Sequence, residues 1–297
     1  MAAESLSRRP VAALAAGAAL ISFAPILVKA AGGSGLAPTA IALWRCLLGA
    51  TILVAAAAVR RQPLDTPREV RGPLLAAGLA FAVDLFVWHR SIVLAGAGMA
   101  TILGATQVFG TATLSALLFR ERLTPRFVLA AVAAMAGVVL LVGVGSRIEF
   151  TADYVAGVAY GLATGLAYAV FLVCLRTAGR RSRGGSTMVR LAWLSIYASA
   201  ALGVMLGAEG AAIWPDDAAT WVYLALLALI AQSLGWWTIS KSLTHVEGAT
   251  GGLVLLMQPV LATVWGVLLF GERLEPLQIL GAAITLAAIA VGSAGDR

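Results

Sequence analysis

Polar side chains that could do chemistry are rare inside the long apolar stretches of this chain, and three of them lie deep within such a stretch. Asp84 is the only carboxylate well inside any apolar stretch. Gln107 and Gln258 each lie about ten residues into theirs, which is about 15 Å of helix at 1.5 Å per residue. A deep carboxylate can bind an amine or exchange a proton, whereas an amide donates and accepts hydrogen bonds at once.

Asp84 has two interpretations. It lies about 18 Å along its predicted helix, just past the membrane midplane, where an ionisable group is a candidate for substrate binding or for proton coupling. Arg45 lies about 10 Å below the outer surface on the preceding helix by the same measure. The carboxylate could therefore instead be the structural charge partner of Arg45.

Aromatic and basic residues surround these candidates. Trp88 follows Asp84 by four residues and shares its helix face, and His89 comes next. These residues could line a vestibule for an amphipathic substrate, or Trp88 could belong to an interfacial belt and His89 could be solvated. Rings that could stack on a substrate or bind a cation, with core packing as the alternative, are Tyr168, Trp193, Tyr197 and Trp237.

The composition indicates that these residues lie on membrane-spanning helices. The chain is 61% hydrophobic and 12% charged, against roughly 25% charged in ordinary soluble domains, so a soluble fold is excluded. A membrane span needs about 20 apolar residues. With that length, we predict an all-α integral membrane protein with ten transmembrane helices, at about 11–31, 38–59, 72–92, 97–118, 125–145, 154–175, 187–208, 219–240, 248–270 and 276–294.

The chain also repeats itself at a distance of 151 residues. The run from Phe119 to Pro125 returns as the run from Phe270 to Pro276, and without a gap Gln107 falls on Gln258. Because each half holds an odd number of helices, five, the second half must enter the membrane inverted. We therefore predict two domains, a first five-helix repeat over 1–147 and a second, inverted repeat over 148–297.

The inversion gives the two glutamines a common setting. Inverted symmetry would bring Gln107 and Gln258 to equivalent midplane positions around a central cavity, where transporters built from such repeats bind their substrates. The alternative is that both amides join neighbouring helices by hydrogen bonds, as glutamine commonly does in membranes.

The positive charges predict an orientation. With a cytoplasmic N-terminus, sixteen of the 21 Lys and Arg residues fall in inside segments, four fall outside, and Arg45 remains within the membrane. This bias predicts cytoplasmic N- and C-termini in a bacterial inner membrane. It also explains the net charge of +7 without nucleic acid, since no basic stripe with interleaved aromatic residues is present.

At this point the chain resembles the EamA family of the drug/metabolite transporter superfamily. The resemblance rests on a Glu-Arg-Leu-x-Pro turn between the fourth and fifth helix of each half, and on Pro38 opening the second helix with Arg45 seven residues later. It implies a basket of ten helices with the fifth and tenth at the periphery. In length and aromatic content the chain is similar to bacterial amino-acid exporters, including the aromatic amino-acid exporters.

These observations predict a secondary transporter that exports amino acids, aromatic or otherwise amphipathic, or similar small metabolites, by alternating access. A multidrug, cation or other metabolite carrier of the same fold is the alternative, followed by a passive channel. An intramembrane enzyme is disfavoured because no catalytic motif or pair of acids is present. We expect no cofactor and no metal, since Cys46 and Cys174 have no ligand spacing, and a monomer or weak homodimer in the bilayer.

Overall fold

The computed structural model describes residues 2–95, 97–142, 151–182, 185–270 and 276–293. In this part of the chain helices are joined by turns and loops and no strand occurs, which confirms the predicted all-α class. Seven helical segments are long and apolar enough to cross a membrane, and three shorter apolar helices bring the predicted spans to ten.

Each half contributes five of these spans. The first half contains α1 (Ala2–Ile21), α2 (Ala24–Gly32), α3 (Pro38–Val59), α4 (Arg68–Ala95), α5 (Ala97–Ala105), α6 (Gln107–Phe119) and α7 (Pro125–Val142). The second contains α8 (Ala152–Arg181), α9 (Thr187–Glu209), α10 (Ala218–Leu226), η1 (Leu227–Gly235), α11 (Trp236–Leu243), α12 (Gly248–Val254), α13 (Met257–Phe270) and α14 (Pro276–Ser293). The predicted boundary between the two domains, at 147/148, lies outside the described residues.

Local chemistry explains where several helices begin. Pro38 opens α3 at a position where a helix needs no backbone donor. The side chains of Thr151 and Ser186 cap α8 and α9 by accepting backbone N–H groups. Asp217 caps α10 and accepts hydrogen bonds from both the hydroxyl and the backbone N–H of Thr220, which lower the pKa of its carboxyl group.

Four spans are not continuous α-helices, which the sequence did not predict. The first is interrupted at residues 22–23, just before Pro25, whose ring disrupts a regular helix. The fourth breaks at Thr106 and the ninth at residues 255–256. The eighth contains the π-helical turns of η1, a form that is frequent at functional sites.

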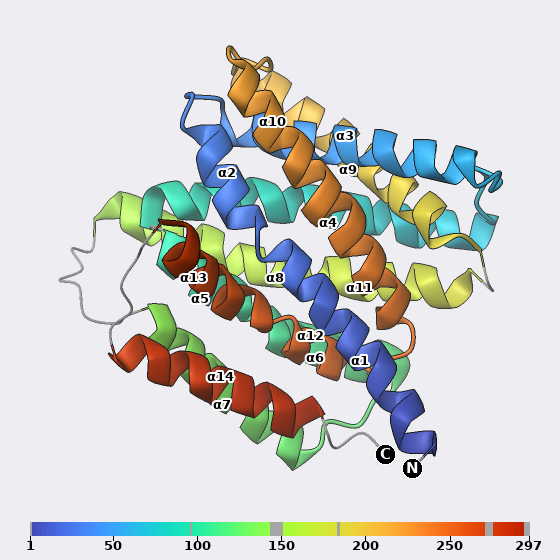
Figure 1. The fold of residues 1–297 in the computed structure, drawn as a ribbon, viewed down its shortest axis with the longest axis vertical. Helices are drawn as coiled ribbons and strands as arrows, with labels where there is room; N and C mark the ends of the chain where they lie inside the picture. Colours follow the sequence, from blue (N-terminus) through green and yellow to red (C-terminus); the bar gives the residue numbers. More distant parts are fainter. Residues whose placement is uncertain (1, 96, 143–150, 183–184, 271–275, 294–297) are drawn as a thin grey trace.

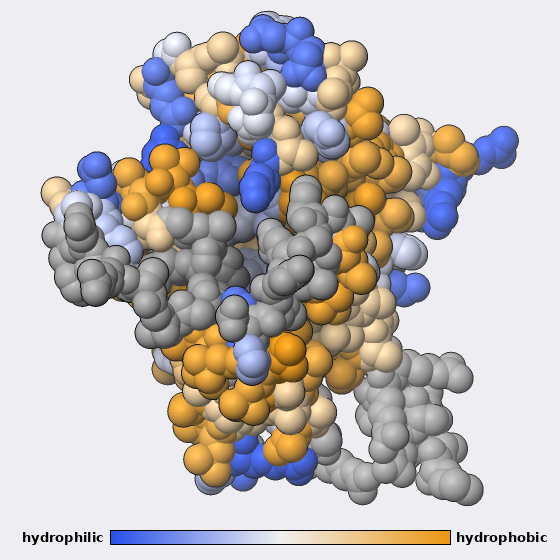
Figure 2. All heavy atoms as spheres, turned by 60° about the vertical axis from the view of Figure 1, so that its left-hand side comes forward, coloured by the Kyte–Doolittle hydropathy of each residue, from blue (hydrophilic) through white to orange (hydrophobic). Residues whose placement is uncertain are grey.

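The outside of the bundle suits lipid. Large apolar side chains such as Leu117, Leu129 and Val204 are at least 72% exposed, which would be costly in water but is favourable against lipid tails. Figure 2 shows hydrophobic residues over much of the visible side, with the most hydrophilic ones mainly toward its periphery.

Inside the bundle, α4 packs along α8 and α9, and α3 packs against α9 and η1. Small residues allow these close approaches. At Gly78 a Cβ atom would lie 2.7 Å from the Cβ of Tyr197, and at Gly49 it would lie 2.4 Å from the Cγ of Gln232. Side chains from both halves thus meet in the core, because glycine lets their backbones come together.

The fifth and tenth spans, α7 and α14, lie side by side away from most of the bundle (Figure 1). Gly137 on α7 faces Thr285 on α14, and a Cβ there would lie 2.4 Å from the Thr285 hydroxyl and 2.7 Å from the Gly281 carbonyl oxygen. This small-residue contact therefore packs the two helices of one chain against each other.

We predict that Gly137→Ala lowers the free energy of unfolding in detergent by about 1–3 kcal/mol, because the added methyl group meets backbone that cannot move aside. Thermal unfolding of the purified protein measures the change. Gly203→Ala is the matched control, since nothing lies within 4 Å of a Cβ there. Equal stability of the two variants would show that α7 and α14 tolerate separation.

Candidate functional site

A buried arginine and a buried aspartate lie near each other in the core of the bundle. Arg45 on α3 is 3% exposed and Asp84 on α4 is 7% exposed. The guanidinium carbon of Arg45 lies 5.4 Å from the centre of the Phe81 ring, one helical turn before Asp84. The two charges act on each other electrostatically, but among the described residues they form no ion pair within 4.0 Å. Direct pairing with Arg45 is therefore not how Asp84 is accommodated.

An amide from η1 holds Arg45 instead. The Nε of Arg45 donates to Oε1 of Gln232 at 3.0 Å, and Nε2 of Gln232 donates to the hydroxyl of Ser195 on α9 at 3.0 Å. Gln232 and Ser195 are 1% and 0% exposed. This chain of hydrogen bonds joins α3, η1 and α9, and Gly49 makes room for it on α3.

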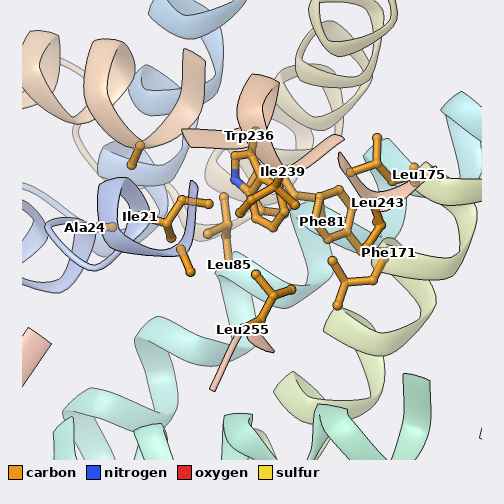
Figure 3. Close-up of a cluster of buried hydrophobic side chains, with 14 of the residues drawn as sticks. Ile21, Ala24, Phe81, Leu85, Phe171, Leu175, Trp236, Ile239, Leu243 and Leu255 are labelled. Carbon is orange, nitrogen blue, oxygen red and sulfur yellow. The ribbon is translucent and has the colours of Figure 1, made fainter. Parts of the chain in front are cut away.

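Aromatic rings from three helices form a cluster (Figure 3), and Arg45 lies over one of them, Phe81. The Phe81 ring stacks on Phe171 with centroids 4.6 Å apart, and Trp236 meets Phe171 edge to face at 4.7 Å. Tyr168 lies 6.1 Å from both Phe171 and Trp236. Phe81 and Phe171 each cover one face of the other, and both side chains are at most 1% exposed.

The two repeat-related glutamines begin the second part of two broken spans, but they have different partners. Nε2 of Gln107 donates to the Gly252 carbonyl oxygen at 2.9 Å, while Thr111 donates to its Oε1 at 3.0 Å. Gln107 is buried and joins α6 to α12, as in the helix-joining alternative. Gln258 is only partly buried, and its Nε2 donates to the hydroxyl of Tyr168 at 3.0 Å.

Gln258 therefore belongs to the central group, because Tyr168 is within electrostatic reach of Asp84 and Arg45. The structure brings together Asp84, Arg45, Tyr168 and Gln258 from the predicted residues. We call these four residues, with Gln232 and Ser195, the central polar cluster.

One end of the bundle carries an ion pair between the two halves. Arg90 at the end of α4 pairs with Glu209 at the end of α9, and Thr39 donates to the same carboxylate at 2.9 Å. The predicted residues Trp88 and His89 lie just below, with ring centroids 5.2 Å apart. His89 is buried near Arg45 and Arg90 and is not a solvated residue.

The opposite end carries a second, deeper ion pair. Glu121, in the turn between α6 and α7, pairs with Arg176 on α8 and accepts the Gly248 backbone N–H at the start of α12 at 2.9 Å. Arg176 is 1% exposed and also donates to the carbonyl oxygens of Leu243 and Val246. The Glu-Arg-Leu-x-Pro turn therefore does more than cap a helix, since its carboxylate joins the two halves.

The remaining predicted aromatic residues have contacts with other residues than those of the central polar cluster. Trp193 donates to the Leu64 carbonyl oxygen at 2.8 Å and packs against Tyr197 with centroids 5.8 Å apart. Lys241 lies 5.5 Å from the centre of the Trp237 ring. The neighbour of Trp237, Trp236, is the residue that enters the core.

Sequence reasoning missed Gln232 and the role of Glu121. Gln232 carried the same signal as Gln107 and Gln258, an amide within an apolar span, but it has no glutamine partner in the repeat. For the described residues, no group of three or more His, Cys, Asp or Glu side chains could hold a metal ion.

Comparison with known proteins agrees with this architecture. Two successive matches to the EamA-like transporter family cover residues 9–143 and 155–293. The threonine/homoserine exporter RhtA of Escherichia coli K12 is 28% identical over 260 residues, which cover 85% of this chain and 80% of that protein. An uncharacterized protein of Pseudomonas aeruginosa, PA1977, is 30% identical over 261 residues, with 84% of each chain covered.

A crystal structure of another protein superposes with a TM-score of 0.81 over 95% of this chain and 97% of that one, at 20% identity, which shows a shared fold. The family matches span nearly all of the ten helical spans, once for each half. The chain is a multi-pass membrane protein and belongs to the EamA-like transporter family.

Proposed function

We propose that this protein exports small amino acids across the bacterial inner membrane by alternating access. The central polar cluster carries the proposal, because it holds a buried guanidinium and a buried carboxylate that are not paired with each other. Such charges are costly in a membrane protein and mark substrate pathways. An amino acid carries the two complementary charges, a carboxylate and an ammonium group.

The proposed substrate is a small amino acid rather than an aromatic one. The stacked rings of Phe81 and Phe171 are at most 1% exposed, so they offer little surface on which a planar side chain could stack. The similar RhtA protein is described as an exporter of threonine and homoserine, both small and polar. Threonine is accordingly the first substrate to test, with phenylalanine as the aromatic comparison.

The two ion pairs supply gates for alternating access. Arg90–Glu209 and Glu121–Arg176 each join one half of the chain to the other, at opposite ends of the bundle. We propose that the halves, 1–147 and 148–297, rock about the central polar cluster and break one pair at a time. The excess of basic residues supports a cytoplasmic location for the Glu121 end and for both termini.

Purified protein in liposomes is expected to take up labelled threonine saturably and to exchange it against unlabelled threonine inside the vesicle. A carrier must bind before it moves its substrate, which makes the rate saturate. Flux that rises linearly with concentration would identify a channel instead. Stronger counterflow with phenylalanine than with threonine would restore the aromatic substrate class.

Asp84→Asn is expected to reduce threonine exchange by about tenfold or more, because a charge-assisted hydrogen bond to the substrate is worth about 1.5–3 kcal/mol. Asp65→Asn, at a carboxylate 82% exposed on a loop, is the control and should leave exchange unchanged. The pH dependence of exchange is measured for both variants. If Asp84→Asn exchanges threonine normally, the carboxylate has no role in binding, and an unaltered pH dependence removes it from proton coupling.

Removing one gate should favour opening at that end. Glu121→Gln is expected to increase labelling of a cysteine placed at Ser240, near the inner end, by a membrane-impermeant thiol reagent added from the cytoplasmic side. Glu209→Gln, which weakens the other pair, should decrease that labelling. Labelling that responds equally to both variants would argue against opposed gates.

A further inference from the structure

We infer that Arg45 binds the carboxylate of the transported amino acid, that Asp84 binds its ammonium group, and that Gln232 positions the Arg45 guanidinium for this task. The inference rests on the proposed function and adds the orientation of the substrate and a residue that sequence reasoning missed. Three features of the structure carry it: the unused donors of Arg45, the way η1 holds Gln232, and the placement of Asp84.

The guanidinium of Arg45 is only partly used by the protein. Its Nε bonds to Gln232, while its two terminal amino groups make no hydrogen bond to any residue that the structure describes. Arginine carries five N–H donors in a planar fork, so four of them remain. A fork of this kind matches the two oxygens of a carboxylate, and a buried one gains strongly by finding such a partner.

Gln232 selects which edge of the guanidinium stays available. Because arginine can only donate, the amide must turn its Oε1 to Arg45, and Ser195 then fixes that orientation by accepting from Nε2. All three side chains are at most 3% exposed, so water does not compete for these bonds. The hydrogen bonds from Arg45 to Gln232 and from Gln232 to Ser195 thus use the Nε edge of the guanidinium and leave its two terminal amino groups for a ligand.

The backbone is shaped around this contact. Gln232 lies within the π-helical turns of η1, where the wider coil displaces a side chain from its regular α-helical position. On the facing helix Gly49 lies so close that any Cβ would meet the Gln232 Cγ at 2.4 Å. An irregular helix and a glycine facing it together bring the amide to Arg45.

Asp84 supplies the opposite charge, one helical turn from Phe81, the ring that Arg45 covers. The Asp84 carboxylate makes no hydrogen bond or ion pair to any described residue, although Arg45 and Tyr168 are within electrostatic reach. An α-amino acid zwitterion carries a carboxylate and an ammonium group a few bonds apart, so it offers one partner of opposite charge to each of these two side chains.

The wild-type protein tests the orientation directly by competition. Threonine amide, which lacks the carboxylate, and N-acetylthreonine, which lacks the ammonium group, are each added to liposomes that exchange labelled threonine. We expect each analogue to inhibit at least about tenfold more weakly than threonine, because each leaves a buried charge without its partner. Inhibition by the amide as strong as that by threonine overturns the assignment of Arg45.

Variants test the role of Gln232. Gln232→Met keeps the length of the side chain and removes the acceptor, so the KM for threonine should rise about tenfold while kcat changes little. Arg45→Lys, which keeps the charge and loses the fork, should raise the KM in the same way. In both variants the weak inhibition by threonine amide should be unchanged, since that ligand never used the fork. A merely structural role would instead lower kcat and the amount of folded protein together.

If Gln232→Met does not fold, Ser195→Ala tests the same role, because it removes one hydrogen bond to the Gln232 amide and keeps the amide itself. It should raise the KM for threonine about threefold. Ser199→Ala is its control, one turn along α9, where the hydroxyl bonds only to the Ser195 carbonyl oxygen. An unchanged KM in Ser195→Ala overturns the positioning role. Absence of any saturable amino-acid exchange in the wild type counts against the proposed function itself.

Discussion

The structure depends on how a mostly apolar bundle accommodates buried positive charge. Arginine does not lose its proton in a protein, so each buried guanidinium must find acceptors or destabilise the fold. Arg176 is surrounded by a carboxylate and two carbonyl oxygens, and Arg190 by hydroxyl groups and a carbonyl oxygen. Arg45 has one amide acceptor. Arg190 leaves only its Nε without a partner, whereas Arg45 leaves both terminal amino groups unused, so Arg45 has the most donors to spare of the three.

The broken helices follow from the same need for polar groups near the middle of the bundle. A continuous α-helix uses its backbone donors and acceptors internally, so it can offer a substrate only side chains. Breaks at Thr106 and at residues 255–256, and the π-helical turns of η1, place polar groups from both halves near the core. They lie in the fourth, ninth and eighth spans, and the last two of these supply Gln258 and Gln232 to the central polar cluster.

Residues at equivalent positions of the two repeats do not have equivalent contacts. Gln107 and Gln258 are equivalent in the sequence, yet one joins two helices and the other bonds to a tyrosine beside the charged pair. The two halves share a fold, but Gln107 of the first half bonds across to the second half, whereas Gln258 bonds within its own half. Gln232 also departs from the symmetry, because it belongs to the central polar cluster and has no glutamine at the equivalent position of the first half.

Much of the fold could be read from the sequence because hydrophobic length and period are local properties. The ten spans, and the positions of Asp84 and Arg45 within them, could be predicted from the lengths of the apolar stretches alone. Which side chains meet could not be read in this way. The contact between Arg45 and Gln232 joins residues 187 positions apart, and it depends on a glycine and a π-helical turn that have no distinctive local signal. The sequence by itself thus determined the membrane class, the spans and the repeated halves. Only the tertiary structure decided which buried charges have hydrogen-bond partners and which remain available, because these partners depend on the distances between helices.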